Sequence, residues 1–114
     1  MIRSLKELPT AVREAIRGGT GRAWLQEMLG AGEMSGVASL SHLTLEPGAT
    51  IAEHPHKGTE ELYIVLGGQG VGLLDGARVA IGPGSFWVVR DGHTHGLENA
   101  PDAPLELLAL LTRA

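Results

Sequence analysis

Hydrophobic and polar residues alternate along most of the chain, in short stretches separated by turns that contain glycine. Residues 37–45, VASLSHLTL, show this alternation and end at a Glu-Pro-Gly turn signal. Side chains two positions apart lie on the same face of a β-strand, so such a stretch predicts a strand with one face toward a core. The pattern therefore indicates β-structure from residue 23 onward.

We expect about eight short strands in this part of the chain, with no internal linker or repeat. One turn is Asp75-Gly76, a dipeptide typical of two-residue hairpin turns. The last stretch, residues 105–111, has a periodicity that also fits a helix, but its position after a turn in a β series favours a strand. Closure would hide the strand edges of such a chain, which predicts one closed or sandwiched all-β domain.

The segment before residue 23 has a different pattern. The sequence TAVREAIRGG has a possible cap at Thr10, a hydrophobic stripe of Val12 and Ile16, and a stop signal at Gly18. These features predict a short helix, or an irregular arm, whose stripe packs against the core. We therefore divide the chain into an N-terminal arm or short helix over residues 1–22 and a single barrel domain over residues 23–114.

Composition narrows the function classes. The 17 glycines among 114 residues agree with many tight turns, and the absence of cysteine excludes disulfides and thiolate chemistry. A net charge of −4 gives no basic face for nucleic acid, and no apolar stretch reaches the length of a membrane span. The absence of cysteine makes the cytoplasm the expected compartment, and the first residues lack the apolar core of a signal peptide.

Histidines and glutamates gather between two of the expected strands. His54 and His56 are two positions apart, so both imidazoles can lie on one strand face. Glu61 opens the next strand, and Glu60 lies on the opposite face of that strand. Strand parity does not choose between the two glutamates, since either face can point inward. His95 begins a later strand and can enter the same cavity.

These residues carry a resemblance to the cupin superfamily. The first cupin motif, G-x5-H-x-H-x4-E-x6-G, is matched by Gly48, His54, His56, Glu61 and Gly68. Glu60 with Gly67 fits its shorter spacing. The second motif, G-x5-P-x-G-x2-H-x3-N, is matched by Gly84, Gly92, His95 and Asn99, with Arg90 in place of its proline. The chain is most similar to small single-domain bacterial cupins, some of them described as oxalate-decarboxylase-like.

The resemblance implies a double-stranded β-helix, or jelly-roll, barrel with His54, His56, Glu61 and His95 as metal ligands. The alternative is a metal-free barrel that retains these polar residues. Three neutral imidazoles and one carboxylate suit one divalent Mn, Fe, Ni, Co or Zn ion, at a site of net charge about +1. Such a site favours a small anionic ligand, either a carboxylate or an enolate.

We expect a metal-dependent enzyme that acts on a small oxygen-rich anion at the barrel mouth. Its reaction would be that of a decarboxylase, dioxygenase, isomerase or lyase, among which fold analogy does not choose. A non-catalytic binding or sensing module is the alternative. The catalytic candidates are Tyr63, His93 and Glu60, and the substrate-binding candidates are Arg90 and His42.

The same strand that opens with Glu61 also predicts an assembly. Leu62, Ile64 and Leu66 would lie on its outer face if Glu61 and Tyr63 point inward. An outward apolar stripe of this kind, together with the cupin resemblance, predicts a homodimer.

Overall fold

The structure is a computed structural model that describes residues 2–113. Within these residues it has ten β-strands and two short 3-10 turns, η1 (Leu5–Glu7) and η2 (Ile16–Gly18). The strands are β1 (Ala11–Glu14), β2 (Arg22–Leu29), β3 (Val37–Leu45), β4 (Thr50–Pro55), β5 (Thr59–Gly67), β6 (Gly70–Leu74), β7 (Ala77–Ile81), β8 (Phe86–Val89), β9 (Thr94–Asn99) and β10 (Leu105–Arg113). No helix among these residues is long and apolar enough to cross a membrane.

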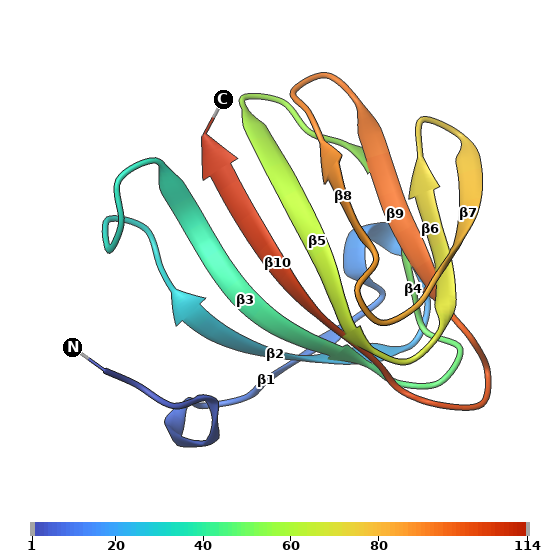
Figure 1. Cartoon of the computed structure of the whole chain (residues 1–114), viewed down its shortest axis with the longest axis horizontal. Helices are drawn as coiled ribbons and strands as arrows, with labels where there is room; N and C mark the ends of the chain where they lie inside the picture. The colour runs from blue at the N-terminus through green and yellow to red at the C-terminus, as the bar shows by residue number, and fades with distance from the viewer. Residues whose placement is uncertain (1, 114) are drawn as a thin grey trace.

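The strands form two sheets that enclose the interior of the molecule (Figure 1). The six-stranded sheet has the order β1-β2-β3-β10-β5-β8, and the four-stranded sheet has the order β4-β9-β6-β7. From β7 to β10 the chain passes from one sheet to the other at each step, and all pairings in both sheets are antiparallel. This arrangement confirms the predicted all-β jelly-roll fold.

Local sequence signals account for the strands of the barrel. The predicted strand over residues 37–45 is β3, whose odd-numbered residues from Val37 are partly or fully buried. Asp75 and Gly76 have φ angles of 48° and 82°, as a two-residue hairpin turn with the right twist requires, and they join β6 to β7. Residues 105–111 form the strand β10, which lies between β3 and β5 and pairs with both.

Of the two expectations for the N-terminal segment, a short helix or an irregular arm, the helix is wrong. Residues 11–14 form β1, an edge strand that pairs antiparallel with β2. Ala15 and Arg17 then adopt left-handed φ angles of 49° and 56°, which an α-helix does not allow, and only the short turn η2 follows. Pairing with β2 thus outweighs the local helix propensity of this stretch. The division of the chain at residue 22 stays a prediction.

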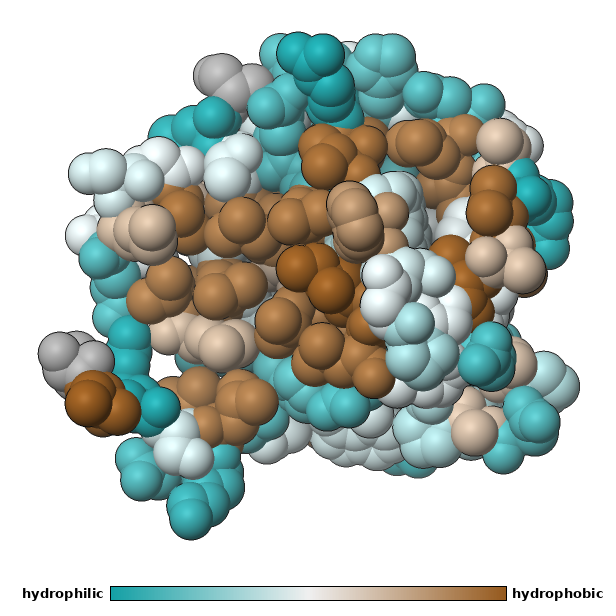
Figure 2. Space-filling view, in the orientation of Figure 1, coloured by the Kyte–Doolittle hydropathy of each residue, from teal (hydrophilic) through white to brown (hydrophobic). Residues whose placement is uncertain are grey.

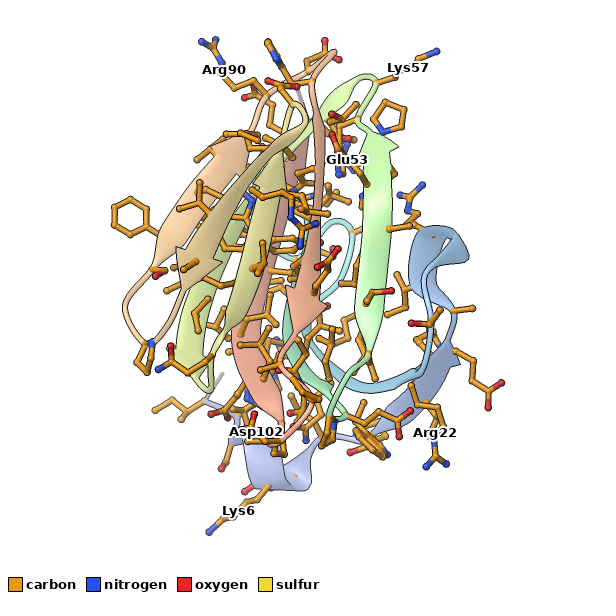
Figure 3. The ribbon with its side chains drawn as sticks, turned by 90° about the vertical axis from the view of Figure 1, so that its right-hand side faces the viewer. Lys6, Arg22, Glu53, Lys57, Arg90 and Asp102 are labelled. Carbon is orange, nitrogen blue, oxygen red and sulfur yellow. The ribbon has the colours of Figure 1, made fainter. Side chains whose placement is uncertain are left out.

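The interior changes in character from one end to the other. Apolar side chains from both sheets, such as Leu45, Leu97 and Leu105, are almost fully buried and form the core. A histidine cluster is buried nearer the end where Figure 3 places Glu53, Lys57 and Arg90, while Arg22 and Asp102 mark the other end. The histidine cluster is therefore a polar site inside a barrel whose core is otherwise apolar.

Candidate metal centre

Strand pairing brings the histidines together from two neighbouring strands. His54 on β4 pairs directly with His95 on β9. Residues opposite each other on paired strands point to the same face, so both imidazoles enter the interior. His56 follows β4, and its backbone N–H and carbonyl continue the contact through hydrogen bonds with His93 and Gly92. One edge of the four-stranded sheet thereby supplies three imidazoles.

The opposite sheet supplies the carboxylate. Glu61 on β5 places its Oε1 atom 3.0 Å from Nε2 of His95 and 3.4 Å from Nε2 of His56. The two Nε2 atoms are themselves 3.0 Å apart. With His54, these residues each offer a ligand atom, and the four atoms lie within 4.8 Å of one another. Glu61 is therefore the glutamate that the structure brings into the cluster.

Hydrogen bonds orient two of the imidazoles. Nδ1 of His54 lies 2.8 Å from the carbonyl of Ala52, and Nδ1 of His56 lies 2.8 Å from the Thr59 hydroxyl. If Nδ1 donates in each case, Nε2 carries the lone pair and points toward the cluster. Burial lowers the pKa of both histidines, which keeps the rings neutral near pH 7 and able to bind a cation.

The donor set is chemically suited to a metal ion. Lone pairs on neighbouring imidazoles and a carboxylate oxygen at these distances repel one another unless a proton or a cation lies among them. Three nitrogen donors and one oxygen donor, without sulfur, suit a divalent transition metal. The cluster is also almost enclosed, since His95 is fully buried and His56 is only 4% exposed. The site is thus able to hold a metal ion.

Tyr63 lies against the cluster. Its ring stacks on the ring of His95 at a centroid distance of 4.5 Å and meets Trp87 edge-to-face at 5.2 Å. Burial raises the pKa of the Tyr63 phenol well above its usual value, and the charge of Glu61 adds to the effect. The phenol is therefore protonated at neutral pH and can donate a hydrogen bond in the interior.

A cavity of about 210 Å³ adjoins the cluster. Its polar side chains besides those already named are Arg13, Arg17, Ser39 and Ser41. Its remaining walls are apolar and come from Ile16, Leu25, Leu43, Ile51, Ala109 and Leu111. A larger hollow of about 310 Å³ between the hairpin β6–β7 and β8 shares no residue with the cluster. Of these two cavities, the one at the cluster is lined both by charged arginines and by possible metal ligands.

Sequence reasoning missed the two arginines of this cavity. Both lie in the stretch that was expected to form a short helix or an irregular arm, where only Val12 and Ile16 were expected to face the core. Ile16 does pack against the core, but Val12 is 52% exposed, and Arg13 on β1 and Arg17 in η2 line the cavity. The alternation of residues 11–14 is too short to reveal a strand, and two cavity-facing arginines leave no other signal in the sequence.

The other four candidates lie outside the cavity. Glu60 points to the rim, where its carboxylate is 3.4 Å from Nε of Arg90. His93 is exposed and contacts Asp75 at 2.8 Å. The remaining candidate is His42 on β3. Its Nε2 atom lies 2.6 Å from a carboxylate oxygen of Glu106 on the neighbouring strand β10. None of the four lines the cavity, and their functional roles stay predictions.

Fold and site together define a jelly-roll protein with three histidines and one glutamate gathered inside the barrel. The family model of the cupin domain matches residues 41–111, which is more than half of the chain and includes all four of these residues. The chain therefore belongs to the cupin family.

Individual relatives are similar over the whole chain. An oxalate-binding protein of Thermotoga maritima is 31% identical over 112 residues, covering 97% of this chain and 92% of that protein. The crystal structure of a protein described as a predicted oxalate decarboxylase, also from Thermotoga maritima, has a TM-score of 0.96 at 28% identity, with full coverage of both chains. A polyketide cyclase of Streptomyces resistomycificus has a TM-score of 0.78 at 20% identity, covering 98% of this chain and 79% of that one, and shows the shared fold alone.

Proposed function

We propose that His54, His56, Glu61 and His95 hold one divalent transition-metal ion, and that the protein binds a small dicarboxylate of the oxalate class beside it. The observation that carries the proposal is the convergence of four buried or half-buried ligand atoms within 4.8 Å, from both sheets. The Mn, Fe, Ni, Co and Zn ions all suit this donor set. A bound ion would supply a positive charge and Lewis-acid polarisation of an anionic oxygen.

The cavity supports an anion as the ligand. Arg13 and Arg17 add positive charge, while the hydroxyls of Ser39 and Ser41 can donate hydrogen bonds. The apolar walls lower the local dielectric constant, which strengthens each of these electrostatic contacts. The oxalate-binding relative at 31% identity also favours a small dicarboxylate.

Tyr63 favours a second candidate function, metal-dependent turnover of the bound anion. A buried phenol that keeps its proton beside the cluster can donate a hydrogen bond to a reacting oxygen on which negative charge develops. Incubation of the metal-loaded protein with oxalate and other dicarboxylates, followed by analysis of products, tests this function. Binding without any product would contradict it and leave the binding function standing.

Metal analysis tests the centre itself. Protein purified without added metal should contain about one divalent ion per chain, and His95→Ala should lose most of it because one of the four ligands is gone. His93→Ala, which removes an exposed histidine two positions away, is the matched control and should keep its metal. Removal of the metal by a chelator should also lower the melting temperature, since an ion that binds only the folded state stabilises it.

Two results would contradict the metal centre. One is an unmutated protein with only traces of metal that also takes up none of the five ions on reconstitution. The other is equal metal content in His95→Ala and His93→Ala. His54→Ala, which removes a ligand that is 8% exposed, provides a second variant if the loss of the fully buried His95 prevents folding.

A further inference from the structure

Arg17 projects into the cavity from an unusual piece of backbone. Three of the four residues from Ala15 to Gly18 have positive φ, and two of them, Ala15 and Arg17, are not glycine. Such residues persist only where surrounding contacts hold them, and they cluster at functional sites. Arg17 is an exposed residue that lines the same cavity as His54 and His56.

The turn is fixed to β4, the strand that carries His54. The backbone N–H of Thr50 donates to the carbonyl of Thr20 at 2.8 Å, and the N–H of Thr20 donates to the Thr50 hydroxyl at 2.9 Å. A Cβ atom at Gly19 would collide with the Thr50 carbonyl, so the two segments are in close contact. Figures 1 and 3 show the blue N-terminal segment beside this strand. The position of Arg17 relative to the cluster is therefore held by the fold.

Neither cavity arginine has an ion-pair partner among residues 2–113. By contrast, Arg3, Arg22, Arg78 and Arg90 each pair with a glutamate. The one carboxylate that lines the cavity, Glu61, contacts His56 and His95 instead. The guanidinium of Arg17 is thus available to a ligand in the cavity. Guanidinium groups bind carboxylates through two parallel hydrogen bonds, which gives both affinity and selectivity.

We propose that Arg17 determines specificity for dianions by binding the second carboxylate of a ligand whose first carboxylate lies at the histidine cluster. This inference rests on the proposed function of the cluster. Apart from the two arginines and two serines, the cavity walls beyond the cluster are apolar. A second carboxylate placed against these apolar walls without a partner would lose hydration at a cost, so a cation at this position favours recognition of a dianion.

Oxalate and oxamate make a matched pair of probes, because oxamate replaces one carboxylate of oxalate by a neutral amide. Calorimetric titration of the metal-loaded protein should show weaker oxalate binding in Arg17→Gln by about tenfold to a hundredfold, as expected for the loss of a hydrogen bond to a charged group. Oxamate affinity should change by less than about threefold, since its amide does not need the cation. Arg17→Lys should lie between, because lysine keeps the charge but not the planar fork.

Lys57→Gln is the control for a general effect of charge. Lys57 is an exposed cation in the turn next to His56, but it does not line the cavity, so this variant should bind oxalate as the unmutated protein does. Metal content is measured in every variant. Unchanged oxalate affinity in Arg17→Gln, or equal losses for oxalate and oxamate, would overturn the role of Arg17. Failure of the unmutated metal-loaded protein to bind oxalate would instead overturn the proposed function.

Discussion

A single position along β5 separates an interior carboxylate from a rim carboxylate. Successive side chains of a strand point to opposite faces, so Glu61 meets His56 and His95 while Glu60 meets Arg90. The two residues have the same chemistry and nearly the same sequence context. Sheet pairing alone gives one of them a place among the imidazoles and the other an ion pair at the surface.

At the same scale, the left-handed backbone of Ala15 predicts a gain in stability on replacement by glycine. A φ of 49° strains an L-residue but not glycine, so Ala15→Gly should raise the free energy of unfolding by up to about 1 kcal/mol. The control is Ala80→Gly in the exposed edge strand β7, which has no positive φ and should lose about 0.5–1 kcal/mol. Urea denaturation measures both. Equal losses in the two variants would show that position 15 carries no strain.

The residues of the site differ in how far sequence could reveal them. His54, His56 and His95 were predictable because two spaced motifs place them in one known fold. Spacing left both Glu60 and Glu61 open, and the structure brings Glu61 into the cluster. Arg17 was not predictable, since its approach to the cavity depends on tertiary contacts between η2 and β4 that leave no short-range pattern. The histidines of the cluster follow a spacing that a motif can recognise, whereas a side chain that reaches the cavity from a turn follows no such spacing.

At the scale of elements, the contact between η2 and β4 predicts that a methyl group at position 19 will disturb the site. Because its Cβ would collide with the Thr50 carbonyl, Gly19→Ala should lower the free energy of unfolding by about 1–3 kcal/mol. It should also weaken oxalate binding by displacing the turn that carries Arg17, while the metal content stays unchanged.

Gly30→Ala is the matched control for this change. A Cβ at Gly30 would meet only the flexible side chain of Glu27 at 3.4 Å, and the backbone there has no positive φ. The free energy of unfolding of Gly30→Ala should change by no more than about 0.5 kcal/mol, and oxalate binding should be unaffected. Denaturation curves and titrations of both variants provide the comparison. Normal stability in Gly19→Ala would contradict close contact between the turn and β4.

Elements were predictable where local pattern and sheet pairing agree. The alternation of β3 and the Asp75-Gly76 turn both specify the structure that forms. In residues 11–14, alanine, arginine and glutamate favour a helix, yet pairing with β2 makes a strand. Local propensity is a weak preference, and an available sheet edge can outweigh it. The error therefore falls where a short edge strand depends on a distant partner.

At the scale of the whole molecule, the six-stranded sheet has two different faces. Its inner face contributes Glu61 and Tyr63 to the site, whereas its outer face has a groove of about 240 Å³ lined only by apolar side chains. The lining residues are Leu29, Met34, Val37, Leu40, Leu62, Ile64, Leu108 and Leu110. Figure 2 shows hydrophobic residues gathered in a broad band over this face. The expected outward direction of Leu62 and Ile64 is thus confirmed.

An exposed apolar surface of this kind is typical of a protein–protein interface, and its continuity across four strands of one chain suits a second copy of the same sheet. We therefore predict a homodimer through this face. Val88, which is 46% exposed and pairs with Leu62 beside the groove, provides the test. Val88→Glu places a charge in the interface, where burial without a partner is costly. The dissociation constant of the dimer should therefore rise by tenfold or more, which corresponds to about 1.4 kcal/mol or more.

Val79→Glu separates an interface effect from a general effect of added charge. Val79 is 61% exposed on β7 of the four-stranded sheet, so the same substitution there leaves the outer groove intact. Sedimentation should show dimers for the unmutated protein and for Val79→Glu, and monomers for Val88→Glu at the same concentration. A monomeric unmutated protein would contradict the homodimer. Because the groove and the cavity lie on opposite faces of one sheet, the monomeric variant should still hold its metal, so that assembly and metal binding can be measured independently.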